Sequence, residues 1–235
     1  MHEHSTTGSK SHTDVDVARS AHTMAQRLED CYSGAVYDVL RALGHPQQVL
    51  PHSIRPLDIN SRLAGPVFTV SGGYHPDLDP HQTLLAWTGM LAKVPSGSVV
   101  ICQPNDSNVA HMGELSAEVL QFRGVRGYIV DGGCRDSAFI QRLGFKVFCR
   151  YYTPLDIVGR WVPETLGAPI VIGDVTIHSG DYVMADRDGT VIIPIKQLES
   201  VVEGTEEVLQ TESLLRKAIL QGEDPQEAYL KYGKF

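Results

Sequence analysis

The stretch that decides the fold is GELSAEVLQFRGVRGYIVDGGCRD, residues 113 to 136. Its pattern predicts the opening turns of a helix, a tight glycine turn, a buried strand and then a glycine-rich loop. Twenty residues separate Glu114, at the helix start, from the adjacent pair Arg135 and Asp136 in the loop. This order predicts that two acids and a guanidinium meet at one place.

These three side chains suggest a particular chemistry. A carboxylate pair suits a hard divalent cation, and the planar fork of an arginine suits a substrate carboxylate or enolate. The local pattern therefore points to metal-assisted work on a keto acid. A simpler interpretation stays open, in which Glu114 only favours a helix N-terminus and Arg135 with Asp136 is a solvated surface pair.

The flanking segments alternate between strands and helices. Paired glycines, Gly72 and Gly73, end one apolar run, and turn residues 95–97 introduce another. The expected elements are strands over 66–70, 98–102, 128–130 and 147–149, a helix over 81–93, and two helices over 17–43 with a break at Cys31 to Gly34. Such alternation indicates an α/β layered core.

The second half of the chain changes character. PIVIGDVTIHSGDYVMADRDGTVIIP, residues 169–194, contains three or four short β-rich runs separated by Gly-Asp, Ser-Gly-Asp and Asp-Gly turn signals. We expect a β-meander packed on the same core. Residues 196–221 then have the spacing of an amphipathic helix, followed by a short helical tail suited to packing or subunit contact.

Composition sets the outer bounds. The chain has 235 residues, 42% of them hydrophobic, a formal net charge of −8 and no basic run, which argues against nucleic-acid binding. Four widely spaced cysteines without CxxC motifs favour a reducing, cytoplasmic setting, and no apolar run predicts a membrane span. We expect a flexible tail over 1–16, with only adventitious metal binding by its histidines, and one domain with C-terminal helices over 17–235.

The span from Leu63 to Pro194 resembles a known family. The matching stretches are LAGPVFTV, the segment 113–136, TPLDIVGR and SGDYVMADRDGTVIIP. In this order they resemble the family that joins the regulator of ribonuclease E activity A to the 4-hydroxy-4-methyl-2-oxoglutarate / 4-carboxy-4-hydroxy-2-oxoadipate aldolases. The resemblance implies a layered α/β/β/α-type sandwich with a mixed central sheet, assembled as a homotrimer or homohexamer.

The resemblance also implies roles for the site residues. The aldolase branch is distinguished by an acid, twenty residues and then Arg-Asp, which this chain supplies as Glu114, Arg135 and Asp136. Asp136 would ligate Mg²⁺ or Mn²⁺ directly, Glu114 would hold a metal-bound water, and Arg135 would contact the oxygen that becomes the enolate. The backbone at Gly113, Leu115 and Ser116, near a helix start, would receive the substrate carboxylate, which agrees with the anion preference of helix N-termini.

The activity implied is that of a metal-dependent lyase acting on a small 2-oxo acid. It would cleave a substrate of the 4-hydroxy-4-methyl-2-oxoglutarate type to pyruvate, and would also decarboxylate oxaloacetate through the same enolate. The alternative is a non-enzymatic, protein-binding regulator of ribonuclease activity on the same scaffold. Family aldolases recruit an acid from a neighbouring subunit, which the sequence does not single out among Glu199, Glu203, Glu206 and Glu207.

Four other motifs have simpler interpretations. HPDLDPH, residues 75–81, has alternating possible metal ligands but is better explained as a polar loop near the site entrance. Asp186, Asp188 and Gly189 are expected in a hairpin turn, because the calcium-loop pattern is not completed. The glycine pairs 72–73 and 132–133 do not make a nucleotide-binding motif, and Cys134 is expected to be a small buried side chain.

One departure from the family concerns the pair Tyr151 and Tyr152. Family members more often carry a small residue before the Thr-Pro that follows. Bulky side chains at this position would narrow or reshape a pocket, so the substrate would differ from that of the family aldolases.

Overall fold

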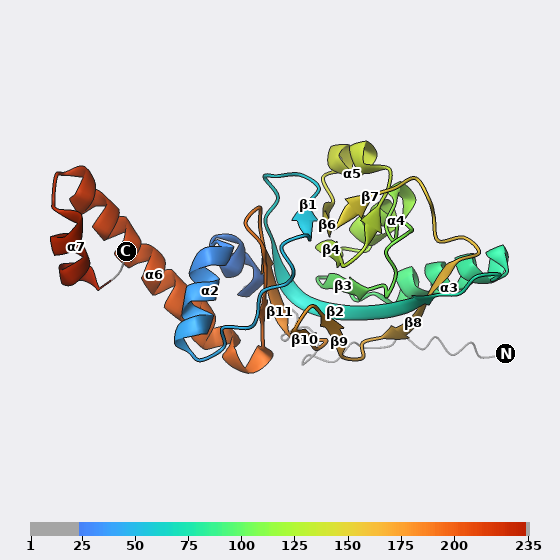
Figure 1. The fold of residues 1–235 in the computed structure, drawn as a ribbon, viewed down its shortest axis with the longest axis horizontal. Coiled ribbons are helices and arrows are strands. Elements are labelled where there is room, and N and C mark those ends of the chain that lie inside the picture. The colour runs from blue at the N-terminus through green and yellow to red at the C-terminus, as the bar shows by residue number, and fades with distance from the viewer. Residues whose placement is uncertain (1–23, 234–235) are drawn as a thin grey trace, which may run out of the picture.

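A computed structural model describes residues 24–233, and its centre is an eight-stranded mixed sheet. The strand order is β1-β6-β4-β3-β2-β11-β12. Outside this order, β8 pairs with the last part of β2, from Val70 to Tyr74. Strands β2, β3, β4 and β6 run parallel, whereas β1, β8, β11 and β12 pair antiparallel with their neighbours. Figure 1 shows the long β2 curving beneath β3 and β4. The main-sheet strands are β1 (Arg55–Pro56), β2 (Leu63–Tyr74), β3 (Val99–Gln103), β4 (Gly127–Val130), β6 (Lys146–Cys149), β8 (Trp161–Leu166), β11 (Tyr182–Ala185) and β12 (Thr190–Ile193).

The strand β2 is longer than the sequence predicts. The expected strand over 66–70 ended at the glycine pair, but β2 continues through Gly72 and Gly73 and pairs there with β8. The register shifts between Ser71 and Gly72, where a β-bulge lies. A Cβ on Gly72 would collide with the Trp161 ring and the Val162 carbonyl oxygen. The glycines therefore permit a close approach of two strands and do not terminate one.

The predicted meander is two separate hairpins. Strands β9 (Ile170–Ile172) and β10 (Val175–Ile177) form one two-stranded sheet, and β11 with β12 joins the central sheet. The meander prediction is wrong between β10 and β11, because the chain there turns onto the edge of β2. Val67 donates from its amide to the Asp181 carbonyl at 2.7 Å, and Gly180 donates to the Val67 carbonyl at 2.9 Å.

Three hydrophobic clusters divide the core into layers. Alternate residues of the strands face opposite sides, so that Val100 belongs to one cluster and its neighbours Val99 and Ile101 to another. The cluster that contains Val99 and Ile101 is the inner one. It also includes Val183 and Ile192 from the β11–β12 half of the curled sheet, and the β9–β10 hairpin covers it. Helices cover the two outer clusters. This arrangement confirms the α/β class with a mixed central sheet in an α/β/β/α order.

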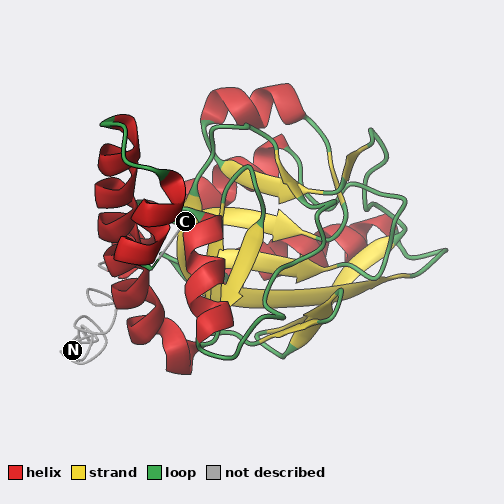
Figure 2. Cartoon of the chain, turned by 60° about the vertical axis from the view of Figure 1, so that its left-hand side comes forward, coloured by secondary structure: helices red, strands yellow, loops and turns green. Residues whose placement is uncertain are grey.

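The helices flank the sheet on opposite sides (Figure 2). Residues 24–29 are helical, and a break at Cys31 and Tyr32 precedes α2, as predicted. Helices α2 and α6 pack on β11 and β12, and α7 folds against α6. The short helix α5 was not predicted, because its 7 residues, about two turns, leave little periodicity to detect. The helices are α2 (Ser33–Ala42), α3 (Pro80–Lys93), α4 (Glu114–Phe122), α5 (Ser137–Leu143), α6 (Leu198–Leu220) and α7 (Pro225–Tyr232), with a 3₁₀ turn, η1, at Ile195–Gln197.

The tail over 1–16, its histidines and the first residues of the predicted helix from 17 lie outside the described residues. Within residues 24–233, no helix is both long and apolar enough to cross a bilayer. All four cysteines are buried and unbridged.

Candidate active site

Two loops that are distant in sequence are joined by backbone hydrogen bonds to make the site. Ala110 and Gly133 form an isolated parallel bridge, and the His111 amide donates to the Gly133 carbonyl at 2.8 Å. The Arg135 amide donates to the Met112 carbonyl at 2.9 Å. The segment before α4 and the loop after β4 therefore run side by side, and the ends of the motif 113–136 meet as predicted.

The glycine-rich loop is packed too closely for any side chain. A Cβ at Gly132 would lie 2.6 Å from Nδ1 of His111, and one at Gly133 would lie 2.5 Å from Cε2 of Tyr151. The Tyr151 hydroxyl donates to the Val109 carbonyl at 3.0 Å, which fixes its ring on this loop. The two glycines thus serve close packing under the site.

Asp136 is held in an uncommon backbone conformation. Its φ of 54° and ψ of 30° place it in the left-handed region, where it also forms the N-cap of α5. Few residues other than glycine adopt this region, although aspartate tolerates it better than most. Its Oδ2 accepts a hydrogen bond from the Glu114 amide at 3.1 Å. Such strain is found most often at functional sites.

Gly113 makes room for that carboxylate. As N-cap of α4 it has a φ of −144°, which any residue can adopt, so the need for glycine is steric. A Cβ there would lie 2.8 Å from Oδ2 of Asp136 and 3.3 Å from Nε of Arg135. Gly113 therefore lies directly against the two predicted site residues.

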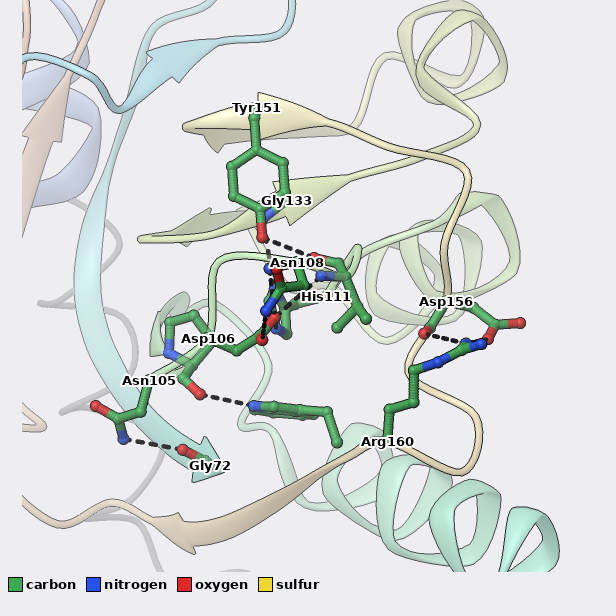
Figure 3. A network of polar contacts seen from close by, with 12 residues as sticks. Gly72, Asn105, Asp106, Asn108, His111, Gly133, Tyr151, Asp156 and Arg160 are labelled. Carbon is green, nitrogen blue, oxygen red and sulfur yellow. Dashed lines mark hydrogen bonds and ion pairs between the residues drawn. The ribbon is translucent and has the colours of Figure 1, made fainter. Parts of the chain in front are cut away.

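Arg135 lies between two carboxylates. Its Nε is 3.5 Å from Oδ2 of Asp136, and its Nη1 donates to Oδ2 of Asp156 at 3.3 Å. Asp156 also binds Nη1 of Arg160 at 3.3 Å through its other oxygen (Figure 3). Sequence reasoning missed Asp156, although the stretch TPLDIVGR that carries it belongs to the recognised pattern. The side chains of Arg135, Asp136 and Asp156 are each between a third and two fifths exposed, so the guanidinium stays accessible to a ligand.

The first turn of α4 presents free donors. The first bond into this helix runs from the Ala117 amide to the Gly113 carbonyl, at 3.0 Å. Within residues 24–233 the amides of Leu115 and Ser116 have no hydrogen-bond partner, whereas the Glu114 amide is taken by Asp136. Free amides and the positive end of the helix dipole favour an anion at this position.

A cavity of about 400 Å³ opens beside these groups. All six residues predicted for the site line it, which brings them together as the sequence predicted. Its lining residues are Leu84, Trp87, Thr88, Leu91, Ala110, His111, Met112, Gly113, Glu114, Leu115, Ser116, Val119, Arg135, Asp136, Asp156, Ile157 and Val158.

His111 is a buried residue of the site that sequence reasoning missed. Its Nδ1 faces the Gly133 amide at 3.4 Å, and its Nε2 is 3.4 Å from Oδ2 of Asp106 (Figure 3). Its ring meets Trp161 edge-on. Burial lowers the pKa of His111 to about 4 and outweighs the opposing effect of the Asp106 carboxylate. A lone histidine in a predicted loop carries no sequence signal that would distinguish it from a surface residue.

The remaining motifs behave as the simpler interpretations predicted. In HPDLDPH, His75 pairs with Glu164 at 2.7 Å and Asp79 caps α3 by accepting from the Gln82 amide. Asp186 closes the β11–β12 hairpin by accepting from the amides of Asp188 and Gly189. Both are structural roles.

Cys134 and the tyrosine pair surround the back of the site. The contact with Cys149 and burial raise the pKa of the Cys134 thiol, which argues against a nucleophile. Tyr152 is exposed and lines a second cavity of about 330 Å³, which Arg135 and Asp136 also line. Of the two bulky tyrosines, Tyr152 lines this second cavity, whereas the Tyr151 ring packs on the glycine-rich loop.

The donor set fits a magnesium-type ion. Among residues 24–233 no cluster of three or more histidine, cysteine or acidic side chains could enclose a metal. Oδ1 of Asp136 has no protein partner in that part of the chain, and Glu114 lines the same cavity. One or two carboxylates, with water completing the shell, is the way proteins usually bind Mg²⁺.

Comparison with protein families gives a match of the RraA-like type, described as Aldolase/RraA, over residues 33–192. The chain belongs to the RraA-like family. This match covers the whole site and the central sheet except for Ile193, the last residue of β12.

Individual relatives of the RraA-like family agree with this placement. Protein DlpA of Legionella pneumophila is 28% identical over 210 residues, which are 89% of this chain, but the chain spans only 34% of DlpA. A protein of Halalkalibacterium halodurans, provisionally named a 4-hydroxy-4-methyl-2-oxoglutarate aldolase, is 28% identical over 77% of this chain and 83% of its own length. The fold resembles that of Streptomyces coelicolor RraAS2, described as an unusual member of the RNase ES inhibitor RraA family, with a TM-score of 0.75 and 24% identity over 83% of this chain and 97% of that one.

Proposed function

We propose that the protein is a divalent-metal-dependent lyase that cleaves a 4-hydroxy-2-oxo acid to pyruvate. The observation that carries this proposal is the convergence of Glu114, Arg135 and Asp136 at the polar end of one cavity. The aldolase name of the H. halodurans relative supports the same reaction type. Decarboxylation of oxaloacetate is included, because it forms the same pyruvate enolate.

The metal is assigned to Asp136, with Glu114 holding water beside it. Oδ2 of Asp136 is fixed by the Glu114 amide, which leaves Oδ1 for the ion. When bound, Mg²⁺ or Mn²⁺ would supply Lewis-acid stabilisation of the negative charge that develops on the substrate.

The protein's own groups orient the substrate. The amides of Leu115 and Ser116 donate hydrogen bonds to the substrate carboxylate at the start of α4. The guanidinium of Arg135 then lies next to the 2-oxo oxygen, where it stabilises the enolate as its charge forms. Glu114 takes up the proton of the 4-hydroxyl through water, so that the bond between C3 and C4 can break.

A non-enzymatic regulator of ribonuclease activity is the second candidate. The likeness of the fold to RraAS2 favours it. A surface that only binds a protein has no chemical need for two carboxylates and a guanidinium around a cavity. We therefore place the lyase first, on either a trimeric or a hexameric assembly.

Pyruvate release distinguishes the two functions. The assay compares 4-hydroxy-4-methyl-2-oxoglutarate, oxaloacetate and related 2-oxo acids, each with Mg²⁺, with Mn²⁺ and with EDTA. The lyase predicts metal-dependent release that EDTA abolishes. No release from any of these acids in either metal would refute the lyase and leave the regulator.

A further inference from the structure

The candidate cavity has one polar end and one apolar end. The polar end is formed by the start of α4 and by Arg135 and Asp136. Away from it, the lining comes from one face of α3, the next turn of α4 and the loop after Asp156; these residues are Leu84, Trp87, Leu91, Val119, Ile157 and Val158. A ligand held at the polar end must therefore extend along a mainly hydrocarbon wall.

The few polar side chains of this wall already have partners. Nε1 of Trp87 donates to Oγ of Ser116 at 2.9 Å, so the only donor of the indole is used within the protein. The Thr88 hydroxyl donates to the Leu84 carbonyl of its own helix at 2.7 Å. A polar ligand group placed against this wall would lose its hydrogen bonds to water and find no free partner in the wall to replace them.

The charges around the cavity also disfavour a second anion. Three carboxylates line it, from Glu114, Asp136 and Asp156, against the one guanidinium of Arg135 among residues 24–233. Asp156 lies at the wall itself, beside Ile157 and Val158. Arg160 does not line the cavity, and its Nη1 is held by the carboxylate and the carbonyl of Asp156, both at 3.3 Å.

We infer, on the basis of the proposed lyase function, that the substrate is a 4-hydroxy-2-oxo acid whose C4 carries a hydrocarbon group in place of a second carboxylate. The 2-oxo carboxylate occupies the start of α4, and the group on C4 lies between α3 and α4. This substrate class differs from the dicarboxylate in the provisional name of the H. halodurans relative.

The reaction is balanced without an oxidant or reductant. In R–CH(OH)–CH₂–CO–COO⁻ the bond between C3 and C4 breaks, and its electron pair forms the enolate of pyruvate. The hydroxyl proton leaves as C4 becomes an aldehyde, and one proton returns to C3. The products are R–CHO and pyruvate, with no net gain or loss of protons.

Binding of two non-cleavable acids tests the inference without depending on their reactivity. 2-Oxohexanoate and 2-oxoadipate have the same carbon skeleton and differ only in a terminal methyl or carboxylate. Calorimetry with the full chain and saturating Mg²⁺ should give a dissociation constant about tenfold lower for 2-oxohexanoate, because the wall buries its terminal methyl favourably but offers no partner to the terminal carboxylate of 2-oxoadipate.

A charge placed on the wall should reverse this preference. Leu84→Arg introduces a cation on the cavity face of α3 and should make 2-oxoadipate the better ligand. Leu85→Arg is the matched control, because Leu85 is the next residue, is similarly exposed and does not line the cavity. The control should keep the wild-type preference.

The alternative outcomes separate this inference from the proposed function. Equal or tighter binding of 2-oxoadipate overturns the inference, and loss of that binding in Arg160→Met would identify Arg160 as the cation responsible. Metal-dependent pyruvate release only from 4-hydroxy-2-oxoglutarate, and not from 4-hydroxy-2-oxohexanoate, overturns it while the lyase function stands. Absence of binding and of release with every acid overturns both.

Discussion

Oδ2 of Asp136 accepts a hydrogen bond from the Glu114 amide at 3.1 Å, which links the two ends of the motif 113–136. Asp136 precedes α5 and Glu114 begins α4, so one carboxylate connects the starts of two helices. The bond occupies one oxygen and directs the other away from the helix amide. A residue that looks like a surface acid in the sequence is thereby fixed at the mouth of a cavity.

Asp136→Asn should strongly reduce catalysis while preserving the fold. Asparagine tolerates the left-handed conformation, and its side-chain oxygen can still accept from Glu114, but the negative charge is lost. We expect metal-dependent pyruvate release to fall by about 10²- to 10³-fold. The thermal midpoint should stay within a few degrees of wild type. Wild-type activity in this variant would remove Asp136 from the site.

Gly113→Ala should weaken metal binding with little effect on stability. The new Cβ would lie 2.8 Å from Oδ2 of Asp136, so the carboxylate must move, while the backbone conformation at φ −144° accepts alanine. We expect the dissociation constant for Mn²⁺, measured by water-proton relaxation, to rise about tenfold. A change of this order is typical when a residue that positions a metal ligand is mutated.

Gly89→Ala is the control for that substitution. Gly89 lies within α3, and a Cβ there meets no atom within 4 Å. Alanine in a helix interior should raise stability by roughly 0.5–1 kcal/mol and leave Mn²⁺ affinity unchanged. Equal affinities in the two variants would show that the space at Gly113 does not matter to the ion.

His111 should make stability fall on the acid side of neutrality. Its folded-state pKa of about 4 lies below the ordinary histidine value near 6.5, so the unfolded chain binds the proton first as pH falls. The stabilising contribution is complete above about pH 6.5 and is lost between there and pH 4, amounting to about 3 kcal/mol. Urea denaturation at a series of pH values gives this slope.

His111→Gln removes that titration and should flatten the slope between pH 6.5 and 4. Comparing slopes makes the test independent of how stable the variant is at pH 7. The neighbouring Asp106 contributes at lower pH, because hydrogen bonds from Val109 and Asn108 outweigh burial and lower the pKa of its carboxyl. An unchanged slope in the variant would mean that the folded state does not lower the pKa of His111.

The sequence predicted the parts of the site that follow one another in the chain. Glu114, Arg135 and Asp136 belong to one helix start and one loop, and the strand β4 between them sets their distance. The buried strands and the amphipathic α6 were predictable for the same reason, because the hydrophobic pattern of each lies within one short segment.

Features that depend on pairing between distant segments were not predictable. Gly72 looks like a strand end, and only the approach of Trp161 and Val162 explains why it lies within β2. Asp156 and His111 join the site through contacts with Arg135 and Gly133 that no local pattern encodes. The split of the predicted meander likewise depends on Asp181 pairing with Val67 across the sheet.

A crystal structure of the protein with Mn²⁺ and pyruvate tests the central claim most directly. We predict the ion on Oδ1 of Asp136, the pyruvate carboxylate on the amides of Leu115 and Ser116, and the 2-oxo oxygen against Arg135. An ion and pyruvate bound away from Asp136 and Arg135, or a fully occupied ion with the cavity empty of pyruvate at saturating concentration, would contradict the proposed lyase site.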